Sequence, residues 1–572
     1  MTNAAEKERQ LILAARQRGP LATLATYVRL SGPGWLQGAI TLGGGSLAGA
    51  LYLGVITGYN MMWLQPLAMI LGVVMLSAIG YVTLSTGKRP FEAIKTHVSP
   101  ALAWAWLLAT MMANIVWCLP QFALGTAAVQ QNLLPQATGG SIGKIVVAVS
   151  LLVVAACVVW FYNSGSWGIR LFEIILKILV GIVVLSFFGV VLAMTYHGVL
   201  DWGKILAGLI PNLSNLFNPV PSLMPQIEAT GSFEGYWRTT IAATQKDKII
   251  TAFATAVGIN MTFLLPYSML RKGWERDHRG LAIFDLSIGL IVPFVLATGC
   301  VVIASASQFH GQPNDVMLLV EAGSGKEVKS YYGIIDNRIK HDVGPERFAT
   351  LSDELSVWEA GGKSGAAPEL VQLRAALPEA ERNLAAALAE RDNLALAKTL
   401  EPLVGPQISQ GLFGVGVLGM ALSTIIILML INGFAFCEML GVPAEGSMHR
   451  IGSLFPAIGV LGPFVWGQAA PALATPTSVI CGAMLPIAYV AFFLLMNSRS
   501  VLGESLPTGF NRIKWNVLMG LATAVALFGS CWGMLDKSVA GFPIGKVMFG
   551  ALVVLLLLGI VGFISKNRTV PR

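Results

Sequence analysis

The stretch SGPGWLQGAITLGGGSLAGALYLGVITG, residues 31–58, is long and apolar enough to cross a bilayer, yet Gly43, Gly44, Gly45 and Ser46 stand at its middle. Backbone that leaves a helix inside hydrocarbon must find partners in protein or in cavity water, because lipid offers none. The glycines therefore favour an unwound segment between two half-helices whose ends face inward. Transport proteins build midplane binding sites in this way. The alternative is that small residues let a neighbouring helix pack closely.

The composition around this stretch is that of an all-α polytopic membrane protein. Hydrophobic residues make up 55% of the 572 and charged residues only 12%, far from the balance of a soluble domain. Apolar runs long enough to span a bilayer recur along the chain. We expect about twelve spans, near 34–57, 61–84, 101–127, 144–163, 171–194, 249–270, 281–306, 408–440, 452–470, 477–496, 515–535 and 543–565.

The formal charge of +8 is a topology signal and not a nucleic-acid footprint. Lys and Arg gather before the first span and after the second, sixth and tenth, whereas the loops 57–60 and 467–476 carry none. The positive-inside rule then places both termini in the cytoplasm of a multi-pass protein of a cell membrane, which we expect to be a bacterial inner membrane. The first thirty residues lack the apolar core of a cleavable signal peptide.

Cysteine and histidine give no sign of a metal cofactor or of catalysis. The six cysteines lie within or beside apolar spans without CxxC spacing, and the six histidines fall outside the middle of any span. No nucleophile–base pair is visible in the spans, so we expect neither an enzyme nor a cofactor.

Two polar insertions divide the membrane domain. The expected organisation is a cytoplasmic segment 1–30, a first core part 31–307 with an external insertion at 197–248, an external and largely helical insertion 308–405, and a second core part 406–572. Leucines at helical spacing and Pro378 predict a helical hairpin that caps the outer mouth. A dimerisation coiled coil is the alternative, but the heptads fail where Arg391 takes a core position. The larger insertion is also the part expected to contact another protein.

The sixth span, ITAFATAVGINMTFLLPYSMLRKGW, is a second candidate for a broken helix. Gly258, Asn260 and Thr262 lie near its centre, with Pro266 just beyond, so we expect the break at about 258–263. Two interrupted spans that are five apart in order predict inverted five-helix repeats with a binding site between them, and two further helices at the C-terminal end.

With both breaks in view, the chain resembles the NRAMP divalent-metal transporters, which have the leucine-transporter fold. GPGWLQGAITLGGGS is similar to the first helix of that family, and GYNMMWLQPLAMILGVVMLSAIGYVTLSTGKRPFEAI to its second helix and basic loop. Arg170, Leu171, Phe172 and Glu173 resemble the opening of the fifth helix, and FDLSIGLIVPFVLATGCVVIASASQFHG the seventh.

The site motifs of that family are missing. Gly43 and Ser46 stand where the resemblance puts the Asp and Asn ligands of the DPGN motif. Thr262 and Leu264 stand at the methionine and histidine of the MPH motif, and Phe263 at its proline. Other departures are Leu119 and Phe122 at the acidic pair of the third helix, and Met484 at a tenth-helix glutamine.

Without these charges, two kinds of solute remain open. A hard cation such as magnesium or manganese could keep several waters and use backbone carbonyls, and an uncoupled magnesium-transporting branch of the resembled family also lacks the proton pathway. A neutral or zwitterionic solute could bind half-helix ends. A third possibility is a non-transporting relative that acts through its external insertion. The residues expected to line the site are Gly43, Gly44, Gly45, Ser46, Gly258, Asn260, Thr262, Ser423 and Thr424, with Ser46, Asn260 and Thr262 as candidate metal ligands.

Overall fold

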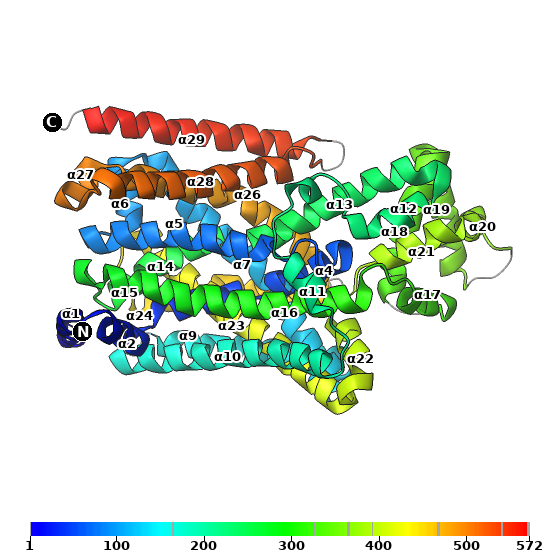
Figure 1. Ribbon diagram of the computed structural model, residues 1–572, viewed down its shortest axis with the longest axis horizontal. Helices are drawn as coiled ribbons and strands as arrows, with labels where there is room; N and C mark the ends of the chain where they lie inside the picture. The colour runs from blue at the N-terminus through cyan, green and yellow to red at the C-terminus, as the bar shows by residue number, and fades with distance from the viewer. Residues whose placement is uncertain are drawn as a thin grey trace.

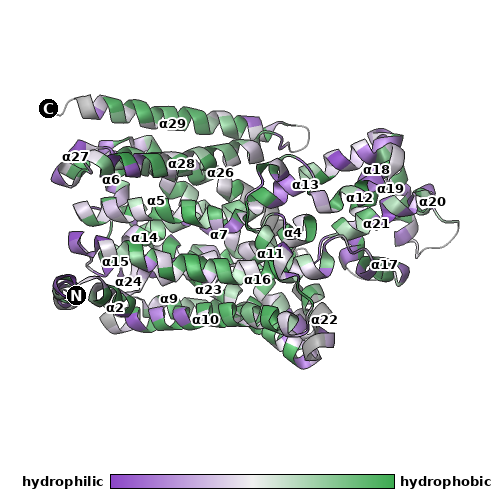
Figure 2. Cartoon of the chain, in the orientation of Figure 1, coloured by the Kyte–Doolittle hydropathy of each residue, from purple (hydrophilic) through white to green (hydrophobic). Residues whose placement is uncertain are grey.

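The computed structural model describes residues 2–162, 165–323, 326–362, 366–391, 393–465, 470–538 and 542–568, and it contains helices and no strands over these ranges. The long helices run side by side along one axis (Figure 1). Both termini lie at one end, here called the terminal side, and a bundle of short helices lies at the other, called the insertion side. Figure 2 shows that the long helices are mainly hydrophobic and that the bundle is mixed. The protein is a multi-pass membrane protein.

The described residues hold nine helices able to cross a membrane, or up to eleven if two bent pairs each count as one span. The helices form the five-plus-five inverted repeat of the leucine-transporter fold, followed by two further helices. The membrane segments are α3 (Pro33–Thr41) with α4 (Gly44–Thr57), α5 (Leu64–Thr86), α7 (Pro100–Ala127), α9 (Gly140–Phe161), α10 (Gly165–Tyr196), α13 (Glu234–Ala254) with α14 (Ile259–Arg271), α15 (Arg279–Leu286) with α16 (Val292–Phe309), α23 (Pro406–Leu440), α26 (Ala470–Met496), α28 (Gly509–Met534) and α29 (Ile544–Arg568).

Both expected breaks exist, but each is shorter and lies earlier in the chain than the sequence indicates. The first comprises Leu42 and Gly43 only, and α3 and α4 bend by 53° across it. The second comprises residues 255–258, so the predicted break at 258–263 is wrong except at its first residue. Pro266 lies inside α14 and does not end it.

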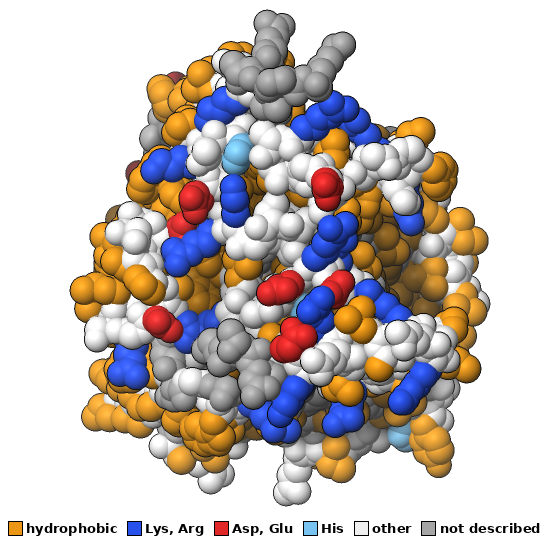
Figure 3. All heavy atoms as spheres, turned by 90° about the vertical axis from the view of Figure 1, so that its left-hand side faces the viewer, with side chains coloured by type: hydrophobic (Ala, Val, Ile, Leu, Met, Phe, Trp, Pro, Cys, Tyr) orange, Lys and Arg blue, Asp and Glu red, His pale blue; other side chains and the backbone are white. Residues whose placement is uncertain are grey.

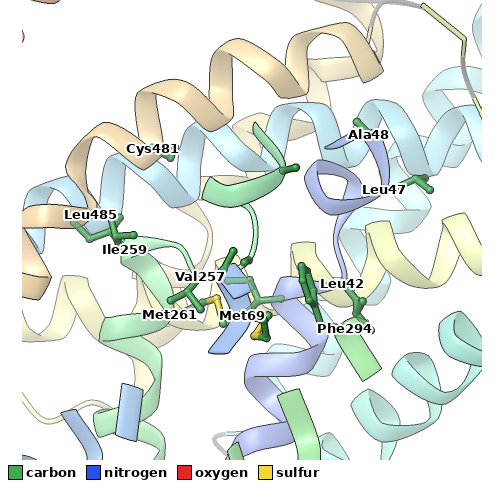
Figure 4. Packing of buried hydrophobic residues seen from close by; sticks show 14 of the residues in the cluster. Leu42, Leu47, Ala48, Met69, Val257, Ile259, Met261, Phe294, Cys481 and Leu485 are labelled. Atoms are coloured by element: carbon green, nitrogen blue, oxygen red, sulfur yellow. The ribbon is translucent and has the colours of Figure 1, made fainter. Parts of the chain in front are cut away.

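The two breaks are built alike. Gly43 and Gly258 both have extended backbone, with φ of −105° and −91°, and each is the N-cap residue of the half-helix that follows it. In Figure 4 Leu42 and Val257 extend from the breaks into one apolar cluster that also holds Met69 and Phe294. This packing fixes the breaks against each other at the centre of the molecule.

The ninth predicted span, 452–470, is not one helix over the described residues. It is divided among α24 (Gly446–Ser453), the 3₁₀ segment η7 (Phe455–Leu461) and α25 (Gly462–Val465), and residues 466–469 lie outside the described part. These short segments pack along α7 and α23. Two prolines and four glycines in this stretch weaken a regular helix, which explains the difference.

The larger insertion contains more than the predicted hairpin. It comprises α17 (Asn314–Glu321), α18 (Lys326–Val343), α19 (Pro345–Ala360), α20 (Glu369–Ala376), α21 (Glu379–Leu388) and α22 (Asn393–Val404). Pro378 is the N-cap of α21, so it opens a helix as expected. The smaller insertion holds α11 (Trp202–Ala207) and α12 (Met224–Glu228), and the segment 1–30 forms α1 (Thr2–Arg18) and α2 (Pro20–Leu30) on the terminal side.

Candidate functional site

A small cavity of about 40 Å³ lies where the two breaks face each other. It is walled by both broken spans and by the long helices α7 and α23. The lining residues are Ile40, Thr41, Gly43, Gly45, Ser46, Trp117, Gln121, Ala254, Thr255, Gly258, Asn260, Met261, Thr424 and Leu428.

Six of the nine residues expected at the site line this cavity: Gly43, Gly45, Ser46, Gly258, Asn260 and Thr424. The other three do not. Gly44 donates its backbone N–H to Gln121 Oε1 at 2.9 Å. Thr262 accepts a hydrogen bond from Trp106 Nε1 at 2.9 Å and donates to the Ile259 carbonyl, and Ser423 donates to the Ala39 carbonyl at 3.0 Å. Thr262 is therefore absent from the cavity lining, where a metal ligand was expected.

Three amide groups at the start of the two half-helices already have acceptors. The N–H of Gly44 is taken by Gln121, and the N–H of Met261 by Asn260 Oδ1 at 3.0 Å. The N–H of Gly258 points at the sulfur of Met261, 3.4 Å away. Helix N-termini bind anions through free N–H groups, so the occupation of these three groups weakens the cavity as an anion site.

The oxygen atoms of the cavity come from hydroxyls and from the carbonyl ends of α3 and α13. Ser46 donates its hydroxyl to the Thr41 carbonyl and lies 3.4 Å from the Thr255 carbonyl. The Thr424 hydroxyl, on α23, has no hydrogen-bond partner among the described residues although it is buried. A buried hydroxyl without a partner is costly, so Thr424 is available to a solute or to water.

Eight lining residues were not foreseen, among them Trp117, Gln121 and Met261. Met261 matters most, because the sequence comparison placed the lost methionine of the resembled family at Thr262 and assigned no thioether to the site. The sulfur of Met261 lies 3.1 Å from the Thr41 hydroxyl, so the cavity does contain a soft donor atom. Gln121 is one of two side-chain amides in an otherwise apolar span, and this polarity could have marked it in the sequence.

The lining contains no Asp, Glu, His, Lys or Arg. No group of three or more His, Cys, Asp or Glu able to hold a metal occurs elsewhere in the described part of the chain. Ala254, Thr255 and Gly258 are half-exposed, whereas Asn260 and Met261 are buried. The cavity is thus more open on the α13 side than on the α14 side.

Towards the terminal side the cavity is closed by aromatic side chains. Phe263 stacks on Tyr267 with ring centroids 4.4 Å apart, and Tyr267 stacks on Phe434 at 5.9 Å. The start of α3 is anchored there by Asp285, which accepts from the N–H of Gly32 at 3.0 Å and of Gly34 at 2.6 Å. Asp285 is therefore a helix-capping residue.

A membrane protein in which two broken helices face each other across a small cavity has the architecture of a secondary transporter. A family profile described as "Natural resistance-associated macrophage protein-like" (Nramp) matches residues 34–325 and 384–536. The chain belongs to the Nramp family, which is a family of transporters and not of enzymes. Residues 326–383, in the larger insertion, lie outside the match.

Individual relatives are distant. "Metal transporter Nramp2" of Populus trichocarpa is 27% identical over 159 residues, which span 27% of this chain and 28% of that protein. A crystal structure of the Eremococcus coleocola manganese transporter, in complex with an aromatic bis-isothiourea substituted compound, superposes with a TM-score of 0.61 at 13% identity over 96% of this chain and 95% of that one. A mutant of the same transporter gives a TM-score of 0.59 at 13% identity over 95% of both chains. At this identity the likeness concerns the fold.

Proposed function

We propose that the protein transports a metal cation, a hydrated divalent ion such as manganese or magnesium, by alternating access with little or no coupling to protons. The observation that carries the proposal is the cavity between the two breaks, which is lined by carbonyl and hydroxyl oxygens and one thioether and by no charged side chain.

The size of the cavity supports a small ion. A water molecule needs at least about 10–15 Å³ of a cavity measured in this way, so a cavity of about 40 Å³ has room for an ion with a few waters and favours a small solute. The saturated N–H groups of Gly44 and Met261 also count against the carboxylate of a zwitterion. Both observations disfavour the organic-solute alternative.

The absence of a carboxylate requires the ion to retain part of its water shell, because full desolvation of a divalent ion is very unfavourable. Magnesium keeps several waters in protein sites. The Met261 sulfur adds a ligand that favours a transition-metal ion over magnesium. Manganese fits this mixture of oxygen and sulfur donors better than magnesium does.

Weak or absent proton coupling follows from the same lining, because a relay needs titratable groups near the solute and the cavity lining has no Asp, Glu or His.

The proposed orientation puts the terminal side in the cytoplasm. On that face Lys and Arg outnumber Asp and Glu (Figure 3), as the positive-inside rule requires. The host membrane is proposed to be the inner membrane of a bacterium.

The test is uptake by purified protein in liposomes that contain a divalent-metal indicator and a pH indicator. We expect uptake of Mn²⁺ without acidification at a comparable rate. Acidification in proportion to Mn²⁺ would contradict the uncoupled mechanism, and uptake of small amino acids in place of Mn²⁺ would establish the organic-solute alternative. If neither solute is transported, and neither raises the melting temperature of the protein, the protein is a non-transporting relative.

A further inference from the structure

The larger insertion is fastened to the two half-helices that lie on its side of the cavity, α4 and α13. These half-helices pack against each other closely: a Cβ atom at Gly49 would lie 3.2 Å from the Cα of Ala252. Gly45 and Ser46 at the start of α4, and Ala254 at the end of α13, line the cavity. A movement of the pair therefore moves two walls of the site.

The first attachment is a buried carboxylate. Glu381, on α21, is fully buried, and its Oε2 accepts from Trp237 Nε1 of α13 at 2.8 Å and from Arg338 Nε of α18 at 2.6 Å. The guanidinium of Arg338 lies over the ring of Phe233, 3.6 Å from its centroid. Arg338 is 1% exposed, so this is a desolvated cluster that joins the insertion to the start of α13.

The second attachment lies nearer to the cavity. Lys248 of α13 is buried, and its Nζ is 2.6 Å from Glu390 Oε1 of the insertion. The same ammonium lies 4.2 Å from the ring centroid of Tyr52 on α4. The ion pair thus ties the insertion to α13, and the cation–π contact of the same ammonium ties α13 to α4.

The third attachment joins the insertion to the rest of the membrane domain. Arg391, which the sequence marked as a break in the heptads, is buried between α21 and α22 and binds Asp315 Oδ1 at 2.8 Å. It also lies over Phe309 at the end of α16, 5.3 Å from the ring centroid. Beyond it, α22 packs along α23, whose Thr424 and Leu428 line the cavity.

We propose that the insertion is a conformational clamp, which holds α4 and α13 against α23 in the arrangement where the cavity is more open on the α13 side. The transport consequence of the clamp rests on the proposed function, whereas the mechanical tie does not. Arg338 and Glu381 fall within residues 326–383, which the Nramp family profile does not match, so the clamp is a feature of this chain beyond the shared core.

The clamp shifts the equilibrium between the conformations of the transport cycle, because its contacts are formed in only one of them. The ammonium of Lys248 is buried whereas Glu390 is 31% exposed, so removal of the carboxylate leaves a buried charge with less compensation and weakens the tie. The arrangement with the clamp closed then becomes less populated. The apparent affinity for a solute that enters from the insertion side falls by the same fraction.

The experiment uses the full-length protein with Glu390→Gln, Lys248→Met and the two changes combined. The matched control is Asp336→Asn, because Asp336 and Arg374 form an ion pair of 2.7 Å within the insertion and not to the membrane domain. Hydrogen exchange of α4 and α13 is followed by mass spectrometry, and initial Mn²⁺ uptake is measured over a range of external concentrations.

We expect hydrogen exchange in α4 and α13 to be at least about tenfold faster in each clamp variant than in the wild type. The double variant should exchange no faster than the single variants. Each clamp variant should also raise the KM for external Mn²⁺ about threefold or more. Asp336→Asn should change neither quantity. Unchanged exchange in α4 and α13, or an equal increase in the control, overturns the clamp. Faster exchange in a protein that takes up no Mn²⁺ supports the tie and overturns the transport proposal alone.

Discussion

The hydroxyl oxygen of Thr41, at the end of α3, lies 3.1 Å from the sulfur of Met261 on α14. The same hydroxyl donates to the Ala256 carbonyl at 2.9 Å. This contact joins the two broken spans at the cavity and places a thioether beside the carbonyl ends of α3 and α13. The donor set is therefore mixed, with several neutral oxygens and one soft sulfur.

The first prediction concerns that sulfur. Met261→Leu conserves volume and burial and should cost less than about 1.5 kcal/mol of stability, but it removes the soft ligand. We expect the affinity for Cd²⁺ to fall about tenfold or more while any affinity for Mg²⁺ stays the same, as measured by titration calorimetry. Met69→Leu is the control, because Met69 is equally buried but does not line the cavity. Equal losses for both ions would show that sulfur is not a ligand.

The second prediction concerns Gly45. A Cβ atom there would lie 2.3 Å from Cη2 of Trp117, so Gly45→Ala must displace the indole and deform the cavity. Uptake should be lost, and Gly45→Ala with Trp117→Leu should recover part of it. Gly181→Ala on α10 is the control, since a Cβ there meets nothing within 4 Å. It should leave uptake intact and stabilise the helix by about 0.5–1 kcal/mol. Normal uptake by Gly45→Ala alone would place the site elsewhere.

Gly45 is constrained by packing and not by its backbone conformation. It lies in the first turn of α4 and is not among the glycines with positive φ. The close approach of Trp117 takes the place of backbone strain. That approach depends on how α7 packs, which the local sequence does not reveal.

The third prediction restores a negative charge. A Cβ at Gly43 would lie 2.5 Å from Oγ1 of Thr424, so Gly43→Asp is best made together with Thr424→Ala. A carboxylate beside a divalent cation is attractive by several kcal/mol even at an effective dielectric constant of about 20. The double variant should bind Mn²⁺ at least about tenfold more tightly than Thr424→Ala does. It should also transport Mn²⁺ more slowly, because the ion leaves the site slowly. Thr424→Ala alone should weaken binding. If the double variant binds Mn²⁺ no better than Thr424→Ala does, the solute is not a cation at this position.

Much of the fold could be predicted because its determinants are local. Apolar runs of sufficient length specify the spans, and the run at 43–46 specifies a break. The error at the second break arose from Pro266, since α14 continues through this proline. Prolines within membrane helices are tolerated where neighbouring helices and side chains satisfy the freed backbone groups, and that depends on packing.

The site was harder to predict because its residues are neutral and have no characteristic spacing. Adjacent residues on a helix are about 100° apart, so a difference of one position between Thr262 and Met261 decides whether a side chain enters the cavity or faces Trp106. Trp117 and Gln121 line the cavity because α7 packs beside both broken spans. Such packing is a property of the tertiary structure.

The last prediction is a pH dependence at the insertion side. His310 bonds the Val55 carbonyl through Nδ1 at 2.9 Å and Ser222 Oγ through Nε2 at 2.8 Å. The first bond requires a proton on Nδ1, and in the neutral ring Nε2 then accepts from the serine. Burial disfavours the charged ring and lowers the pKa of His310 below its usual 6.5.

Because the folded protein then binds fewer protons at His310 than the unfolded chain does, this stability is present above about pH 6.5 and is lost as the pH falls from there through the lowered pKa. His310→Gln keeps a donor and an acceptor but does not titrate. We therefore expect its melting temperature to fall less than that of the wild type between pH 7.5 and about pH 5. His341→Gln, at an exposed position, should follow the wild-type profile. Parallel profiles for His310→Gln and the wild type would mean that His310 does not link Val55 of α4 to Ser222 in its neutral form.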